Sequence, residues 1–385
     1  MTPLPAARRA AAALALLAAG CASTSGPARP AGSGSPAAAP LSLASAVTGP
    51  GATWAVVPMG AASGANQFWQ LFLLPAGTSQ WSLQTPPDIA TNGALLLAGQ
   101  PGQGVIVGER PILSLTFSAI TTTRDGGQTW ATLPPAAGLA GVPDALAAAP
   151  DGRLLALSGS QQVTTTGPAG NWATLTTGRA LAATPAGRNC ALTGLTAAAY
   201  TPAGSALLAG ACSRPGVTGI FASAGGTWQL AGPALPASLA GQQIRVLRLS
   251  RAGGQDVALL QAGTGTAASL LAAWTSDGGQ HWQLSAPLGL DGTDPVSVSF
   301  GAGGAAAVVL SANRGETLAG PGASWHALPR LPAGHAITLA MPAAGITEVL
   351  TATGTQLTVW RLTSGPAAWA RTQAITVPIQ YGSSS

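Results

Sequence analysis

Two closely related stretches decide the fold of this chain: residues 123–130 read TRDGGQTW and residues 275–282 read TSDGGQHW. Each places an aspartate and two glycines a few residues before a tryptophan. An aspartate carboxylate can accept hydrogen bonds from the backbone amides of its own turn, and glycine adopts the positive φ angles that tight hairpin turns require. We therefore interpret both stretches as structural turns that connect neighbouring β-strands.

The tryptophans that end these stretches belong to a longer series. Its members are Trp81, Trp130, Trp172, Trp228, Trp282, Trp325 and Trp369. They are separated by 49, 42, 56, 54, 43 and 44 residues, an average of 48. A period of 40 to 50 residues built from short β-like segments is typical of propeller blades. The turn before Trp228 keeps two glycines and a threonine, whereas Trp81, Trp172 and Trp369 keep little beyond the tryptophan.

The two stretches resemble the Asp box, or BNR repeat, of sialidase-like and sortilin-like β-propellers. The family pattern is Ser/Thr-x-Asp-x-Gly-x-Thr-Trp. The first stretch matches it at Thr123, Asp125, Gly127, Thr129 and Trp130, and the second matches at Thr275, Asp277, Gly279 and Trp282 but has His281 in place of threonine. The resemblance implies that the aspartates serve the turn rather than catalysis, and that each tryptophan packs between adjacent sheets.

Short strands separated by turn residues recur within each period. In one period we predict strands at 145–149, 153–158, 162–166 and 172–176, and in another at 244–249, 256–260, 270–275 and 282–285. No stretch after the first 21 residues shows sustained helical periodicity, which favours an all-β fold. The expected architecture is a seven-bladed β-propeller of four-stranded antiparallel blades at residues 44–380, followed by a polar tail at 381–385.

The amino terminus has the composition of an export signal. Residues 1–21 read MTPLPAARRAAAALALLAAGC, with Arg8 and Arg9 before an apolar stretch too short to span a bilayer as a helix. Its end resembles a bacterial lipobox, which implies removal of residues 1–20 and lipid attachment to Cys21. Ala18 stands where that motif commonly has leucine. An ordinary secretory signal with an incidental cysteine remains the alternative.

Residues 21–43 consist almost entirely of serine, glycine, proline and alanine, the composition of a disordered linker. A flexible chain of this length reaches roughly 25 Å. We therefore expect an exported monomer held at the outer face of the cytoplasmic membrane by the lipid on Cys21.

Two further cysteines bear on the compartment. With Cys21 committed to lipid, Cys190 and Cys212 form an even pair, and export places them in an oxidising environment. We predict that they form a disulfide. Two buried free thiols are the alternative.

The basic residues are all arginines, and only 7% of the residues are charged, so the high isoelectric point does not reflect a dense basic surface. The densest group is Arg245, Arg248 and Arg251, which we interpret as a solvated strand edge. Nucleic-acid binding needs a denser basic stripe and is not expected.

The sialidases that share the Asp box use an arginine triad, a tyrosine and glutamate nucleophile pair and an aspartic acid/base. The tyrosines here are Tyr200 and Tyr381, and the glutamates are Glu109, Glu316 and Glu348. Residues 109–112 hold some residues of that family's arginine motif in the wrong order. We therefore predict no catalytic set.

Cofactor and metal sites are not expected either. His281, His326 and His335 lack the spacing of metal ligands, and residues 291–294, DGTD, fit a turn better than a calcium site. The main hypothesis is a binding or assembly scaffold for a protein, peptide or glycan. The alternative is a sialidase-like exo-glycosidase or a carbohydrate-binding protein, for which Glu109 and Asp88 are the acids to alter.

Overall fold

The computed structural model describes the greater part of the chain after residue 44. The described ranges are 45–60, 67–86, 95–100, 102–109, 120–133, 143–159, 161–166, 171–310, 314–334, 336–362 and 368–378. They belong to one compact unit at 36–385. The predicted signal peptide, Cys21, the linker at 21–43, Asp88, His335 and the tail at 381–385 lie outside the described residues.

The strands form groups of four in which chain order is also spatial order, each antiparallel throughout. The first group is β1 (Ser45–Thr48), β2 (Ala52–Gly60), β3 (Gln67–Pro75) and β4 (Ser82–Leu83). The next is β5 (Leu95–Gly99), β6 (Val105–Glu109), β7 (Ile120–Thr123) and β8 (Ala131–Thr132). Then come β9 (Pro143–Ala148), β10 (Leu154–Ser158), β11 (Gln162–Thr166) and β12 (Trp172–Thr177).

The second half of the chain repeats the arrangement. It begins with β13 (Leu192–Tyr200), β14 (Ala206–Cys212), β15 (Ile220–Ala224) and β16 (Thr227–Leu230). It continues with β17 (Ile244–Ala252), β18 (Gln255–Ala262), β19 (Ser269–Thr275) and β20 (Gln283–Leu284), with β21 (Leu288–Gly289) also paired to β19. It ends with β22 (Pro295–Phe300), β23 (Ala306–Leu310), β24 (Arg314–Leu318) and β25 (His326–Ala327), and with β26 (Ala336–Ala343), β27 (Ile346–Thr353), β28 (Gln356–Leu362) and β29 (Trp369–Thr376).

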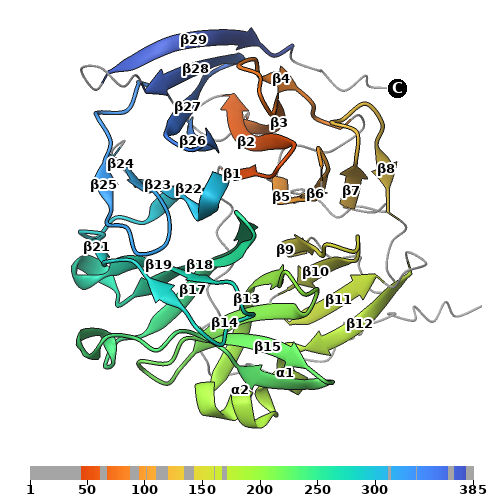
Figure 1. Cartoon of the computed structure of the whole chain (residues 1–385), viewed down its shortest axis with the longest axis vertical. Helices are drawn as coiled ribbons and strands as arrows, with labels where there is room; N and C mark the ends of the chain where they lie inside the picture. Colours follow the sequence, from red (N-terminus) through yellow and green to blue (C-terminus); the bar gives the residue numbers. More distant parts are fainter. Residues whose placement is uncertain are drawn as a thin grey trace, which may run out of the picture. The chain divides into compact units, whose positions relative to one another are not determined.

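Apolar side chains from successive sheets pack against one another, and the succession closes on itself. Leu96 and Leu154 meet between the β5–β8 and β9–β12 sheets, for example. Phe72 of the β1–β4 sheet packs in the same way against Leu350 of the last sheet. The strands that begin the sheets follow the same circular order, and β26 contacts β1 and β2 (Figure 1). Sheets arranged in a closed circle define a β-propeller, so the predicted all-β propeller fold is confirmed at this level.

Hydroxyl groups on the first strands join neighbouring sheets. The Thr196 hydroxyl of β13 donates to the Val246 carbonyl of β17 over 2.9 Å. The Thr338 hydroxyl of β26 donates to the Val56 carbonyl of β2 over 3.1 Å. Because these groups are buried, each bond satisfies polar atoms that would otherwise lose water without compensation.

A direct backbone link also joins β1 to β22, where Val47 and Phe300 form a parallel pair. The Ala46 amide donates to the Ser299 hydroxyl oxygen beside it, over 2.9 Å. β26 contacts both strands. The first strands of the β1–β4 and β22–β25 sheets therefore pair directly with each other.

The strand predictions in two periods agree with the structure within a few residues, as β11 and β12 illustrate. The structure adds two short helices that the sequence reading did not expect, α1 (Gly178–Ala182) and α2 (Pro185–Cys190). The Thr177 and Thr184 hydroxyls cap their amino termini by accepting hydrogen bonds from backbone amides. The described ranges also contain three short 3₁₀ turns: η1 (Ala237–Leu239), η2 (Gly265–Ala267) and η3 (Ala302–Gly304).

Candidate binding site

The Asp125 carboxylate is used within its own turn. It accepts hydrogen bonds from the Thr129 hydroxyl at 2.5 Å, the Thr129 amide at 3.0 Å and the Thr123 hydroxyl at 2.7 Å. These bonds, led by that of the Thr129 hydroxyl, lower the pKa of Asp125 to about 2. The Gly127 amide donates to the Thr123 hydroxyl oxygen over 3.0 Å, with Gly127 at a φ of 86°. Asp125 therefore stabilises the turn between β7 and β8.

Asp277 makes the same kind of turn between β19 and β20. Its carboxylate accepts from the His281 amide at 3.0 Å and the Thr275 hydroxyl at 2.8 Å, and it lies 2.6 Å from Nδ1 of His281. The hydrogen bond from the His281 amide is the largest cause that lowers the pKa of Asp277. His281 thus takes the contact that Thr129 makes in the other turn. The Gly279 amide donates to the Thr275 hydroxyl oxygen over 3.0 Å.

Each tryptophan of the periodic series packs between its own sheet and the sheet before it in the circle. The members are Trp130, Trp172, Trp228, Trp282, Trp325 and Trp369, together with Trp81, for which the preceding sheet is the last one. Trp130 also meets the ring of Trp54 edge to face, with 6.3 Å between centroids. Trp81 is the most buried of the series.

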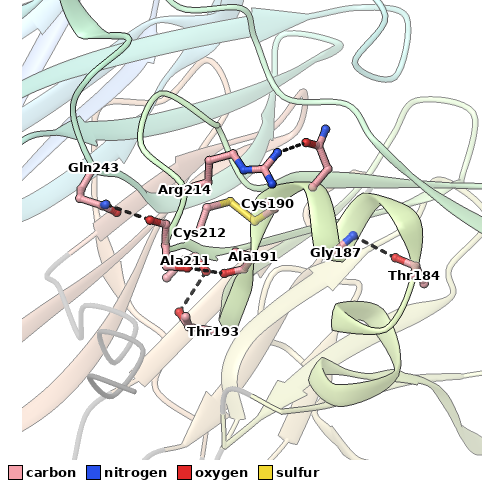
Figure 2. Close-up of a disulfide and its surroundings, with 11 residues drawn as sticks. Thr184, Gly187, Cys190, Ala191, Thr193, Ala211, Cys212, Arg214 and Gln243 are labelled. Carbon is pink, nitrogen blue, oxygen red and sulfur yellow. Dashed lines mark hydrogen bonds between the residues drawn. A yellow bond between two sulfur atoms is a disulfide. The ribbon is translucent and has the colours of Figure 1, made fainter. Parts of the chain in front are cut away.

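The predicted disulfide between Cys190 and Cys212 is present in the structure, with 5.0 Å between the Cα atoms (Figure 2). Both cysteines are buried. The bond ties the end of α2 to the end of β14, and the Arg214 guanidinium beside it donates to the Asn189 side-chain oxygen over 2.5 Å. The disulfide therefore fixes the helical insertion to the β13–β16 sheet.

A channel at the centre of the circle of sheets contains a cavity of about 70 Å³. Residues of β1, β5, β9, β13, β17 and β22 line it, among them Arg248 and Arg251. The interpretation of Arg245, Arg248 and Arg251 as a solvated strand edge is therefore wrong for Arg248. Its strand is at the edge of a sheet, but that edge faces the channel, and desolvation lowers the pKa of Arg248 to about 10.

A larger cavity of about 660 Å³ lies where the turns of four sheets meet. It is lined by the β1–β2 turn at Pro50, the β17–β18 turn at Gly253, η3 at Gly303, the β26–β27 turn at Ala344 and the side chain of Arg361. Small residues and proline dominate the lining, so backbone groups are exposed along its wall. Its volume falls within the usual range of ligand sites.

Arg361 is the cationic residue among the described residues that line this cavity, and the buried Glu348 carboxylate fixes its guanidinium group. Its Nε and Nη2 donate to Oε1 of Glu348 over 2.9 and 2.5 Å, and Glu348 Oε2 accepts from Nε1 of Trp81 over 2.8 Å. Glu348 is fully buried, whereas the Arg361 side chain is 31% exposed. Glu348 takes two of the five guanidinium N–H donors of Arg361, which is one of the residues that line the cavity. No short motif connects Glu348 with Arg361, so the sequence reading did not find this pair.

The other acids that the structure describes lie mostly in local contacts. Asp151 pairs with Arg153, and both Asp291 and Glu316 pair with Arg314. Burial raises the pKa of Glu316. Within the described ranges no group of three or more histidines, cysteines and acids is placed to hold a metal ion. In that same portion of the chain, no helix is both long enough and apolar enough to span a membrane.

The Tyr200 hydroxyl lies 2.6 Å from the Thr165 hydroxyl, and burial is the largest cause that raises the pKa of Tyr200. The Arg153 guanidinium stacks over the Tyr200 ring, 5.4 Å from its centroid. This tyrosine therefore joins the β9–β12 and β13–β16 sheets.

No family model and no curated protein matches the chain. Among solved structures, YCF48 bound to D1 peptide is 20% identical over 76% of this chain and 79% of its own, with a TM-score of 0.39. YCF48 from Cyanidioschyzon merolae is 14% identical over 83% and 91%, with a TM-score of 0.45. A six-bladed β-propeller lectin, Aleuria aurantia lectin, is 12% identical over 88% and 96%, with a TM-score of 0.39.

Proposed function

We propose that this chain is an exported, lipid-anchored β-propeller of seven blades that binds a protein or peptide without catalysis. The observation that carries the proposal is the 660 Å³ cavity lined by hairpin turns, with Arg361 fixed at its wall by Glu348. Binding residues on loops that a rigid scaffold positions are a common arrangement. The function is argued from this site, since a propeller scaffold hosts many activities.

The pairing of sheets with tryptophans supports the proposed count of seven blades. Each four-stranded group carries one tryptophan of the series, and each of these side chains enters the apolar layer before its own sheet. The turns at Asp125 and Asp277 have the hydrogen bonds expected of Asp boxes. Both features support a seven-bladed propeller of the Asp-box type.

The chemistry of the cavity favours a peptide over a sugar. A sugar presents many hydroxyls that require polar partners, whereas this lining is mostly glycine, alanine and proline, with Thr48, Thr53, Thr78 and Arg361 as polar exceptions. An extended peptide can use exposed backbone groups for hydrogen bonds and place apolar side chains against small residues. Arg361 then supplies donors for a peptide carbonyl.

Site-specific photo-crosslinking in intact cells tests the location of the site. A photoreactive amino acid replaces Thr78, an exposed residue at the cavity, and in a control it replaces Ser238. Ser238 lies in η1, before β17, whereas the cavity borders the turn after β17. We expect a protein partner captured from position 78 but not from 238. Capture of nothing at 78, or of the same partner at both positions, would contradict the proposal.

The resemblance to the sialidase Asp box supports a second candidate, a sialidase-like exo-glycosidase or a carbohydrate-binding protein. A panel of fluorogenic glycosides separates it from the first. Turnover that Glu109→Gln or Asp88→Asn abolishes would establish catalysis and overturn the non-catalytic proposal.

The export signal and lipobox-like ending support anchoring through Cys21 at the outer face of the cytoplasmic membrane. Metabolic labelling with an alkyne fatty acid tests it. We expect incorporation into the wild-type chain and loss of both label and membrane association in Cys21→Ser. Equal labelling of the two chains would show that Cys21 is not the attachment site.

A further inference from the structure

Among the residues that the structure describes, no acid forms an ion pair with Arg248, which lines the central channel. Arg248 lies on β17, one residue after Leu247, where the register with β18 shifts between Val246 and Arg248. Such a bulge redirects the side chains that follow it. Arg248 borders the 70 Å³ cavity and is partly buried.

The surroundings of Arg248 provide burial without a counter-charge. Within the part of the chain that the structure describes, its guanidinium has no hydrogen bond or ion pair. Desolvation alone lowers its pKa, to about 10, so the group remains protonated at neutral pH. Two other charged residues border the cavity: Arg251, whose charge acts on Asp256, and Asp144, which has an interaction of its own.

We propose that the channel binds a small monovalent anion against Arg248. A desolvated charge is costly unless an opposite charge or strong hydrogen bonds compensate it. β17 is also the edge strand of its sheet, so its outer edge can offer backbone N–H donors to the same anion. The arrangement is a cationic side chain beside a strand edge in a small channel.

The volume limits the anion. The cavity is small: its 70 Å³ is well below the roughly 300–1,000 Å³ of typical ligand pockets. A compact anion such as chloride or formate therefore suits this space better than the larger gluconate. The residues that line this channel site differ from those that line the larger cavity of the proposed function.

Thermal unfolding of the purified full chain tests the site. Sodium chloride and sodium formate are titrated against sodium gluconate at constant ionic strength, so that screening is equal in all arms. We expect a saturable rise in melting temperature of about 2–4 °C with the small anions, because a ligand that binds only the folded state stabilises it. An equal response to gluconate would overturn the proposal.

Substitution of Arg248 assigns the effect to this residue. Arg248→Met should abolish the anion dependence and should not lower the melting temperature in gluconate, since it removes an uncompensated charge. Arg245→Met, near the start of the same strand, should keep the full response. A response retained in Arg248→Met would contradict the assignment.

Diffraction from wild-type crystals soaked in bromide gives an independent result that does not depend on how a variant folds. An anomalous peak beside the Arg248 guanidinium would support the site. Its absence from the channel would overturn the proposal.

Discussion

Asp256, on β18, has both carboxylate oxygens buried and without a hydrogen-bond partner among the described residues. Burial raises its pKa to about 7, while the charge of Arg251 acts in the opposite direction. Between the unfolded pKa, about 4, and about 7 the folded chain therefore holds a proton that the unfolded chain has released. The stability of the fold then falls as the pH rises through this range, and the loss is complete above pH 7.

We predict that Asp256→Asn removes this pH dependence. The shift from 3.8 to about 7 corresponds to about 4 kcal/mol as an upper bound on the gain at pH 8, and the gain at pH 4 should be near zero. Urea unfolding of the wild type and of Asp256→Asn at pH 4, 6 and 8 measures this gain in unfolding free energy. The control is Asp294→Asn, an exposed acid that should change stability little at each pH. Equal effects of Asp256→Asn at pH 4 and pH 8 would contradict the explanation.

Glu348 provides a second residue-scale prediction. Its two oxygens accept from Arg361 and Trp81, and the amide of Glu348→Gln has one acceptor oxygen in their place, so one donor loses its partner. We expect a loss of about 2 kcal/mol in unfolding free energy. Asp291→Asn breaks an ion pair in which the acid is 73% exposed and should cost less than about 0.5 kcal/mol. Similar losses in the two variants would show that the buried pair contributes no more than the exposed one.

Some of these residues could be predicted from the sequence. The aspartates at 125 and 277 act within eight-residue stretches, so local spacing is enough to assign their contacts. Glu348 and Arg361 meet only because β27 and β28 pair in one register, and Arg248 lines the channel because β17 is the sheet edge that faces it. Composition and residue spacing do not show which residues of two strands lie opposite each other. For this reason the sequence does not predict the larger cavity, whose lining comes from turns of several sheets.

At the scale of elements, strand positions could be predicted and the α1–α2 insertion could not. Strands alternate with turn residues over short distances, whereas α1 and α2 are too short to show a helical period. One local signal was present: Thr184 and Pro185 are a cap and a favourable first residue for a helix. The insertion covers the apolar layer between two sheets, where Leu181 is fully buried.

The disulfide stabilises this insertion against unfolding. It closes a loop with a sequence separation of 22, and loop-closure entropy for that size amounts to about 3 kcal/mol. We predict that the double variant Cys190→Ser/Cys212→Ser loses about this much in urea unfolding. Reductant should lower the stability of the wild type by a similar amount and leave the variant unchanged. A wild type that alkylates at two thiols before unfolding would contradict the bond.

At the scale of the whole molecule, the circle of sheets closes through contacts between the β1–β4 and β26–β29 groups. The β26–β29 sheet holds only strands from the end of the described chain, and β1 pairs outside its own group of four with β22. The described strands of the first and last sheets are therefore joined by the isolated Gly60–Gly354 bridge and not by a strand ladder. Closure depends on side-chain contacts and on hydrogen bonds between the two sheets. Gln373 contributes two of these bonds: its side-chain oxygen accepts from the Trp81 amide and its side-chain nitrogen donates to the Trp81 carbonyl, each over 2.8 Å.

We therefore predict that Gln373→Ala weakens closure out of proportion to its size. Loss of both bonds leaves a backbone amide and carbonyl without partners at a largely buried position, which should cost about 1–3 kcal/mol. Gln356→Ala is the matched control, because exposed Gln356 bonds Thr376 within one sheet and should change stability by less than about 0.5 kcal/mol. In urea unfolding of Gln373→Ala, the free energy of unfolding should also depend less steeply on the urea concentration. The reason is that the first and last sheets would separate before the sheets themselves unfold, so unfolding would no longer be a two-state process. An unchanged slope, with equal losses in the two variants, would mean that the apolar layer around Trp81 holds the circle closed without these bonds.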